Sequence, residues 1–434
     1  MRRISTVLLV TGTLAVLVPG LAHAAAGTTT LVSVTTDGTA AHGISGAPSI
    51  TPDGRYVAFT SSATNLVASD TNRASDVFVR DRQTGVTTRV SVDSAGNQAN
   101  DRSGSPSISA DGRYVVFVSG ATNLVAGDTN RAQDVFLHDL TTGATSRVSI
   151  GWLGDQANSD SYHPVISADG QFVAFDSSAS NIVADDTNGV HDVFEHYVPG
   201  QYTSRVSIDS NRFQANGLSQ RPSISADGQY VAFESDASNI ALFPDTNGVA
   251  DIFVHDRLSE RTDRVSLNAD GDEGNGHSRF ATMSADGRYF VYTSYASNLV
   301  PGDTNDNGDM FLFDRWRFTV TRVDVGPQGE QLRGGTTMGI TPSISADGRY
   351  IAYESGADDL IPGDYNNSWD VFVRDRVAAT TTRVSVADDG SEANSDSEMP
   401  SISGDGKHVA FMSYATNLAP DTADFSANVF VRDR

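Results

Sequence analysis

The chain has 434 residues, with 54 acidic against 30 basic side chains, a formal net charge of −24 and no cysteine. The negative charge argues against nucleic acid and anionic membranes as partners, because their phosphates would be repelled. The lack of cysteine excludes disulfides, thiol nucleophiles and thiolate metal sites.

Residues 1–24 have the pattern of a secretory signal peptide. Arg2 and Arg3 form a short basic region, residues 4–18 are mostly apolar, and Ala22-His23-Ala24 fits a small-x-small cleavage site. Removing this segment leaves 30 − 2 = 28 basic residues against 54 acidic ones, a net charge of −26. No later segment is apolar enough to cross a bilayer. We therefore expect a secreted protein without membrane insertion, formed by residues 25–434.

One phrase, clearest in residues 106–119, recurs along the rest of the chain: two short β-rich runs separated by Asp-Gly. Successive copies are 58 to 61 residues apart, and such a regular period indicates an array of one supersecondary unit. The turn aspartates of the seven copies are Asp53, Asp111, Asp169, Asp227, Asp286, Asp347 and Asp405.

Within one copy the pattern predicts four strands. In the second copy these are residues 106–109, 113–119, 134–139 and 145–150. Tight turns at Asp-Gly and Thr-Gly alternate with two long loops, and no copy holds an apolar stripe of helical length. Four antiparallel strands make one blade, so seven copies predict an all-β, seven-bladed β-propeller. An open solenoid is the alternative.

The two ends of the chain favour the closed ring. The last copy stops after its third strand, at residues 429–434, and residues 29–34 match the fourth strand at residues 87–92. The amino-terminal strand is therefore expected to complete the last blade, whereas an open array would leave both edges unpaired. Residues 25–434 are predicted to be one domain.

The phrase Ser-Ala-Asp-Gly-Arg-Tyr-Val-Ala-Phe, followed by Asp-Val-Phe-Val-Arg-Asp, resembles the WD40-like PD40 repeat of the TolB-type propellers. The resemblance covers essentially the whole mature chain and implies the propeller fold. It leaves function open, because propellers host unrelated activities. Seven copies replace the six of TolB, and the chain leaves no room for a separate amino-terminal domain, so TolB's partners are not carried over.

The strand order places both long loops of each blade on one face, here called the long-loop face. The first of these loops carries Asp-x-Asn-x-x-x-Asp, whose oxygens suit Ca²⁺, the one candidate cofactor. The alternative is that these residues form Asx turns that precede the third strand. The main candidates are Asp128, Asn130 and Asp134; Asp186, Asn188 and Asp192; and Asp303, Asn305, Asn307 and Asp309.

The copies disagree six residues before each turn aspartate, a register expected to face the mouth of the central channel. A mixed ring of aromatic, cationic and polar groups there suits an anionic or carbohydrate ligand. The alternative is neutral variation at water-filled positions. The ring is Ala47, Ser105, His163, Arg221, Phe280, Thr341 and Met399, adjoined by Tyr162, Gln220, Arg279 and Glu398.

Signs of catalysis are fewer. The sequence has no Gly-x-Ser-x-Gly elbow. Some PD40-like propellers are metal-dependent pectate-fragment lyases whose sites gather several histidines, but His138, His196 and His255 share a register with arginines and are expected to be surface substitutions. The recurring arginine of the fourth strand is likewise expected to be an edge charge that blocks strand addition.

We therefore predict a secreted, monomeric, non-catalytic propeller that binds a protein or an extracellular polysaccharide through its long-loop face. The alternative is a metal-dependent polysaccharide lyase or hydrolase with its site at the channel mouth around His163 and Arg221.

Overall fold

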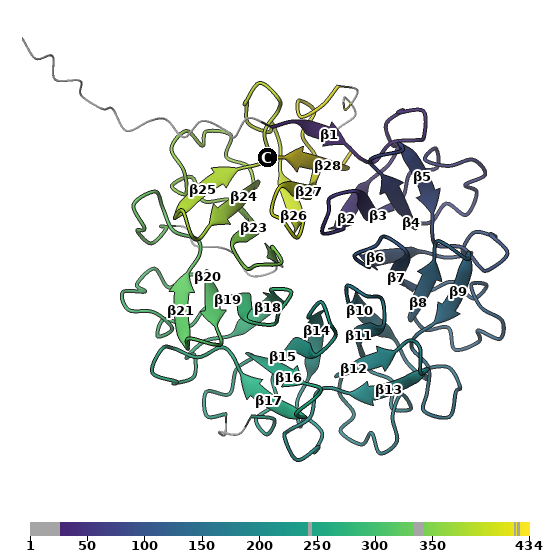
Figure 1. Cartoon of the computed structure of the whole chain (residues 1–434), viewed down its shortest axis with the longest axis horizontal. Helices are drawn as coiled ribbons and strands as arrows, with labels where there is room; N and C mark the ends of the chain where they lie inside the picture. Colours follow the sequence, from purple (N-terminus) through teal and green to yellow (C-terminus); the bar gives the residue numbers. More distant parts are fainter. Residues whose placement is uncertain (1–26, 242–244, 334–341, 421, 423–425) are drawn as a thin grey trace, which may run out of the picture.

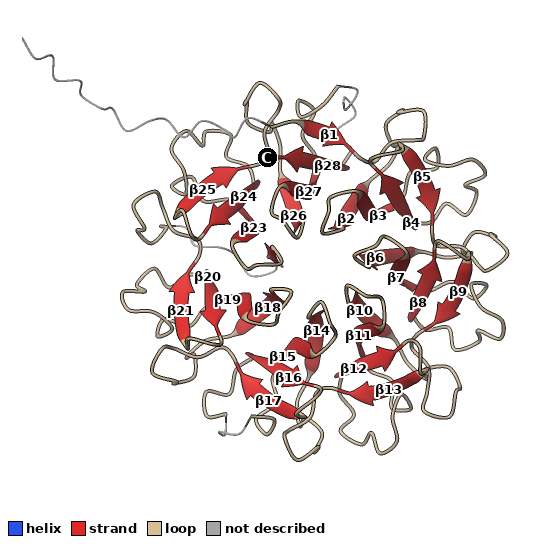
Figure 2. Ribbon diagram, viewed as in Figure 1, coloured by secondary structure: helices blue, strands red, loops and turns tan. Residues whose placement is uncertain are grey.

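Seven four-stranded antiparallel sheets surround a central opening in the computed structural model (Figures 1 and 2). The structure describes residues 27–241, 245–333, 342–420, 422 and 426–434. Within this part of the chain there is no helix, and hence none that could span a membrane. The prediction of a seven-bladed, all-β propeller with four strands per blade is confirmed.

Blades one to seven follow the order of the chain, and each runs from an inner strand at the channel to an outer strand at the rim. Blades one to three comprise β2 (Ser45–Ile50), β3 (Tyr56–Ser61), β4 (Asp76–Asp81) and β5 (Val86–Arg89); β6 (Ser103–Ile108), β7 (Tyr114–Ser119), β8 (Asp134–Asp139) and β9 (Ala144–Arg147); and β10 (Ser161–Ile166), β11 (Phe172–Ser177), β12 (Asp192–Tyr197) and β13 (Tyr202–Arg205). Blades four to six comprise β14 (Ser219–Ile224), β15 (Tyr230–Ser235), β16 (Asp251–Asp256) and β17 (Arg261–Arg264); β18 (Ser278–Met283), β19 (Tyr289–Ser294), β20 (Asp309–Asp314) and β21 (Thr319–Arg322); and β22 (Ser343–Ile344), β23 (Tyr350–Ser355), β24 (Asp370–Asp375) and β25 (Thr380–Arg383). Blade seven comprises β26 (Ser397–Ile402), β27 (His408–Ser413), β28 (Asn428–Asp433) and the amino-terminal β1 (Thr29–Leu31).

The Asp-Gly turn between the two inner strands has a local and a packing reason. In blade two the Asp111 carboxylate accepts hydrogen bonds from the Ser109 hydroxyl at 2.7 Å and from the Arg113 backbone N–H at 3.0 Å. Gly112 has a φ of +72°, which favours glycine. A Cβ there would also lie 2.3 Å from the ring of Tyr56 in blade one, so glycine is required for blade packing as well.

The core lies between neighbouring blades. Phe117 and Phe136 are fully buried, with ring centroids 5.9 Å apart. They pack with Val77 and Val79 of blade one, and the same arrangement recurs around the ring. The middle strands of a blade carry continuous apolar runs rich in β-branched and aromatic residues, as in β7 and β8, so each sheet is buried on both faces.

The amino-terminal strand closes the ring. β1 pairs antiparallel with β28, with Thr29 opposite Arg432, and the Asp433 N–H donates to the Thr28 carbonyl at 2.9 Å. Val32 is 2% exposed in a cluster shared by blades seven and one. Closure by the amino-terminal strand is thus confirmed, while the predicted leader, residues 1–24, lies outside the described residues.

Candidate functional site

In blades one to five and in blade seven, the variable ring residue occupies a β-bulge at the start of the inner strand. In blade three the register shifts between Tyr162 and Val165, and His163 has a φ of 49°. Arg221 and Phe280 have φ values of 54° and 58°. A left-handed backbone is uncommon for non-glycine residues because it costs conformational free energy. It recurs at these positions because the β-bulge is part of the inner strand of the blade. The described members are Ala47, Ser105, His163, Arg221, Phe280 and Met399; Thr341 lies outside the described residues.

These bulges surround a cavity of about 790 Å³ at the mouth of the central channel. Seven residues of the predicted ring and its neighbours line it together: Ala47, Ser105, His163, Arg221, Phe280, Glu398 and Met399. Tyr162, Gln220 and Arg279 lie next to this lining and contact its supporting groups. Glu354 and Trp369 also line the cavity and were not predicted from the sequence.

In blade three the lining is supported by Asp176, a carboxylate whose side chain is only 1% exposed. It accepts from His163 Nδ1 at 2.8 Å and from the Arg221 backbone N–H at 3.1 Å, and His191 Nδ1 lies 3.5 Å from its other oxygen. Burial raises the pKa of Asp176, but the contacts with the two imidazoles outweigh it, so the pKa is lowered. Asp176 in turn raises the pKa of His191, whose ring stacks on Tyr162.

In blade four Glu234 has the same role and is 2% exposed. Its carboxylate accepts from the Gln220 amide at 2.7 Å and from the Phe280 N–H at 3.0 Å. The oxygen that accepts from Gln220, Oε1 of Glu234, also lies 3.5 Å from Arg221 Nε and 3.8 Å from Arg279 Nη1. The Arg221 guanidinium stacks 4.5 Å above the Phe280 ring, which fixes its plane at the cavity wall.

Across the channel the lining is acidic. The Glu354 carboxylate accepts from the Met399 N–H at 2.5 Å, and Glu398 lies beside Met399 in the lining. Burial, opposed by the Met399 hydrogen bond and reinforced by Glu398, raises the pKa of Glu354 to about 7. The cavity therefore has an imidazole and guanidinium side and, opposite it, a carboxyl side next to Trp369.

Blades one and two show what the fold alone requires at these positions. There the bulge residues are Ala47 and Ser105, and the residues in place of Asp176 and Glu234 are Thr60 and Val118. The buried carboxylates are therefore not needed to form a blade. These carboxylates were not predicted from the sequence, although the variation falls at one fixed position, seven residues after each turn aspartate. From blade one to blade seven this position holds Thr60, Val118, Asp176, Glu234, Thr293, Glu354 and Met412.

The aspartates of the first long loops contact an arginine. In blade two Arg147 Nη2 lies 2.9 Å from Asp128, and its Nε lies 3.6 Å from Asp134. The Asn130 amide donates to Asp134 at 3.0 Å, and its oxygen accepts the N–H of Ala132 in an Asx turn. Arg147 is 8% exposed, so the prediction that the fourth-strand arginines are exposed edge charges is wrong: they are buried because the loop carboxylates surround them.

The other metal candidates share this arrangement. In blade three Arg205 Nη2 lies 3.2 Å from Asp186 and its Nε 3.6 Å from Asp192, while Asn188 donates to Asp192. In blade five Arg322 lies 3.3 Å from Asp303 and 3.1 Å from Asp309. There Asn305 donates to Asp309, and Asn307 donates from its backbone to Asn305. A guanidinium thus supplies the positive charge that these loops were predicted to take from Ca²⁺.

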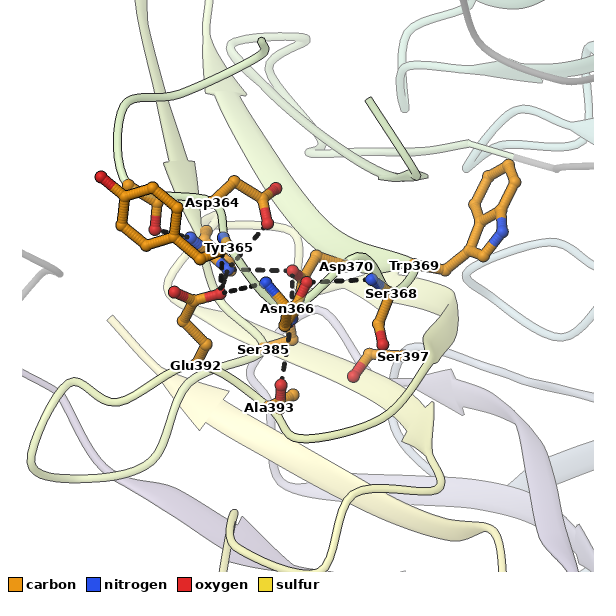
Figure 3. Close-up of polar contacts among 12 residues, drawn as sticks. Asp364, Tyr365, Asn366, Ser368, Trp369, Asp370, Ser385, Glu392, Ala393 and Ser397 are labelled. Atoms are coloured by element: carbon orange, nitrogen blue, oxygen red, sulfur yellow. Dashed lines mark hydrogen bonds and ion pairs between the residues drawn. The ribbon is translucent and has the colours of Figure 1, made fainter. Parts of the chain in front are cut away.

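Blades four and six add a third carboxylate. In blade six Glu392 lies with Asp364 and Asp370 in one cluster (Figure 3). Arg383 lies among them, with its Nη1 2.8 Å from Glu392 and 3.0 Å from Asp370. Asp245, Asp251 and Glu273 surround Arg264 in the same way. Burial raises the pKa of Asp251 and of Asp364 to about 6, even though the arginine lowers it. These carboxyl clusters have an arginine at their centre and lie away from the channel lining.

The three histidines of the third strands are buried, so the prediction that they are surface substitutions is wrong. His138, His196 and His255 are 4%, 1% and 6% exposed. Each Nδ1 lies 2.9 Å from a fourth-strand threonine hydroxyl, as in the pair His196–Thr203. They fill the space between the outer strands, and burial lowers the pKa of His196 to about 4.

No protein-family model matches the chain. No curated protein matches it either. Among solved structures it is similar to an oligogalacturonate lyase from Vibrio parahaemolyticus, with 12% identity, 95% of this chain and 98% of that chain covered, and a TM-score of 0.54. An oligogalacturonate lyase in complex with manganese has 13% identity, 94% and 90% coverage and a TM-score of 0.52. A TolB from Agrobacterium tumefaciens has 16% identity, 64% and 80% coverage and a TM-score of 0.41. At these identities the likeness concerns the fold alone.

Proposed function

We propose that this chain is a secreted binding propeller that holds an acidic oligosaccharide in the cavity at the mouth of its channel. One observation supports it best: the exposed side chains of blades three and four rest on buried carboxylates that the fold does not need. Burying Asp176 and Glu234 costs free energy unless each is hydrogen-bonded, and each is given partners that also fix His163 and Arg221. Such support is typical of a preorganised binding site.

The lining favours a sugar acid over a neutral ligand. Arg221 and Arg279 both approach Glu234, but Arg279 also lies 3.8 Å from Asp236, whereas the Arg221 side chain remains 37% exposed at the cavity wall and can meet a ligand. A guanidinium whose plane is fixed on Phe280 suits the planar carboxylate of a uronate. Trp369 and the carboxyl groups of Glu354 and Glu398 supply a stacking face and acceptors for hydroxyl groups on the opposite side.

Titration calorimetry with oligogalacturonate and with a neutral oligosaccharide of equal length tests this function. We expect saturable binding of the acidic ligand alone, weakened roughly tenfold or more in Arg221→Gln, because a charge-assisted hydrogen bond is lost. Arg113→Gln is the matched control, since Arg113 is a similarly exposed arginine on the opposite face, paired with Asp139. Equal binding of both sugars, or an unchanged affinity in Arg221→Gln, contradicts the proposal.

The second candidate function is a lyase or hydrolase acting at the same cavity. It is supported by His163, which faces the cavity with Nδ1 held by the buried Asp176, an arrangement able to orient a general base. Manganese, which one similar lyase holds, would need further ligands: among the described residues, no group of three histidines or carboxylates with converging ligand atoms includes a cavity residue. Appearance of an unsaturated product from oligogalacturonate, followed by ultraviolet absorbance, would favour the lyase.

Secretion and calcium binding stay part of this proposal. The leader pattern at residues 1–24 supports secretion, and amino-terminal sequencing of protein recovered from the medium tests it. For calcium, an increase in melting temperature with millimolar Ca²⁺ that a chelator reverses would support binding, by linkage. Because an arginine already occupies the space between the loop carboxylates, we expect any such shift to be small.

A further inference from the structure

Blade five differs from all other blades at its outer strands. In the other six, the fifth residue of the third strand is arginine or histidine and contacts a threonine hydroxyl of the fourth strand. His138 and Thr145 are 2.9 Å apart, and Arg80 donates to Thr87 at 3.0 Å. In blade five this pair is Phe313 and Val320, which cannot form the contact.

The same pair normally binds the preceding loop to the blade. The Thr145 hydroxyl donates to the Val92 carbonyl at 2.5 Å, and Thr87 donates to Val34 at 2.6 Å. Val320 has no hydroxyl to donate to the corresponding loop at Leu267. The missing hydrogen bond leaves room between the loop and blade five.

A pocket of about 350 Å³ lies beside this pair. Its lining comes from β17 and the loops around it in blade four and from β20 and the turn that follows it in blade five, two blades that are neighbours in the ring (Figure 1). Leu267, Val265, Phe313 and Phe318 form its apolar walls. Phe313 and Phe318 meet edge to face, with centroids 5.5 Å apart. Phe318 remains 51% exposed with a φ of 55°, a strained position for a bulky residue.

The pocket also has a cation without an acidic partner. Arg261 pairs with Asp263 at 2.7 Å, and Arg264 lies among three carboxylates, of which Glu273 also lines the pocket. Among the described residues, no carboxylate lies within 4.0 Å of Arg315, which lines the pocket while its guanidinium lies over the Tyr230 ring. The equivalent Arg376 in blade six also lies over a tyrosine ring, that of Tyr289, but in addition donates to the Gly348 carbonyl.

From these features we propose that the pocket between blades four and five binds a small aromatic carboxylate. The ring of the ligand packs on Phe313 and Phe318, and its carboxylate accepts hydrogen bonds from Arg315. The size is that of a ligand site, with an apolar wall on one side and a polar wall that holds Arg261, Arg264 and Arg315 with the carboxylates of Asp263 and Glu273 on the other. The pocket lies on the outer rim, so this site is independent of the channel cavity.

Titration calorimetry with 2-naphthoate and with the neutral 2-naphthalenemethanol tests the proposal on the full mature chain. We expect one saturable site for 2-naphthoate. Arg315→Gln should weaken naphthoate binding roughly tenfold and leave the alcohol unchanged, because only the charged hydrogen bond is lost. Arg376→Gln, the matched arginine of blade six, should change neither.

The double substitution Phe313→His with Val320→Thr restores the pair used by blades two to four and should close the pocket. We expect it to abolish naphthoate binding while circular dichroism shows an intact propeller. Absence of saturable naphthoate binding to the wild-type chain would overturn the proposal. So would equal losses in Arg315→Gln and Arg376→Gln, a comparison that holds even where the double variant does not fold.

Discussion

His196 is expected to make the propeller sensitive to acid. Its side chain is 1% exposed, and burial lowers its pKa to about 4 from an ordinary value of 6.5. The folded state therefore binds fewer protons than the unfolded chain, and the stabilisation is complete above pH 6.5 and lost as the pH falls toward 4. A difference of about 2.5 pKa units corresponds to about 3 kcal/mol in the free energy of unfolding.

The substitution His196→Gln removes this titration while an amide still reaches the Thr203 hydroxyl, which lies 2.9 Å from the imidazole. We expect both proteins to have similar stability above pH 6.5, with the variant more stable by about 3 kcal/mol near pH 4. Urea unfolding at the two pH values, followed by tryptophan fluorescence, measures the difference. Other titrating groups are common to both proteins, so they cancel in this comparison. Parallel losses of stability in both proteins on acidification would refute the reasoning.

Three further predictions concern stability. Burial raises the pKa of Glu195 to about 7, although Arg257 opposes it, so the stability that this group contributes is lost as the pH rises from 4.5 through 7. The substitution Glu195→Gln should therefore raise the free energy of unfolding above pH 7 by up to about 3 kcal/mol, as measured by urea unfolding. Arg147→Met should cost about 3 to 5 kcal/mol by leaving buried carboxylates unpaired, whereas Arg113→Met, at an exposed pair, should cost at most about 1 kcal/mol. Deleting residues 25–34 removes the buried Val32 and Val34 with β1 and should lower the free energy of unfolding by roughly 3 to 6 kcal/mol; an unchanged melting temperature would contradict closure by this strand.

The fold was predictable because each blade repeats the same local signals. The Asp-Gly turn, the alternation of the strands and the match between residues 29–34 and 87–92 each specify a neighbour in space. The position of the channel ring followed from the same period. The burial of Arg147 and His196 could not be predicted in this way, because a charged residue on an outer strand has the same local pattern whether it faces solvent or is covered by a loop.

The candidate site was found only in part for a related physical reason. His163 and Arg221 stand out because they break a repeat at an exposed register. Asp176 and Glu234 break it too, but within a strand, seven residues after the turn, where a lone carboxylate usually faces solvent. Their role depends on the blade that follows, since Asp176 accepts the N–H of Arg221 and Glu234 that of Phe280. Such contacts between blades cannot be read from one copy of the repeat.

In a ring of similar blades, the blades that lack a feature show whether the fold needs it. Blades one and two build the channel mouth from Ala47 and Ser105 without a buried carboxylate, so the free energy spent on burying Asp176 and Glu234 is not required by the ring. Selection for stability alone would favour the cheaper version in every blade. The same reasoning applies to the half-exposed aromatic ring of Phe318. Its turn position is left-handed in blades one to four and six as well, but there it holds Gly85, Gly143, Gln201, Glu260 or Ala379 and no aromatic ring. Departures that cost stability and occur in few blades are therefore where binding should be tested first.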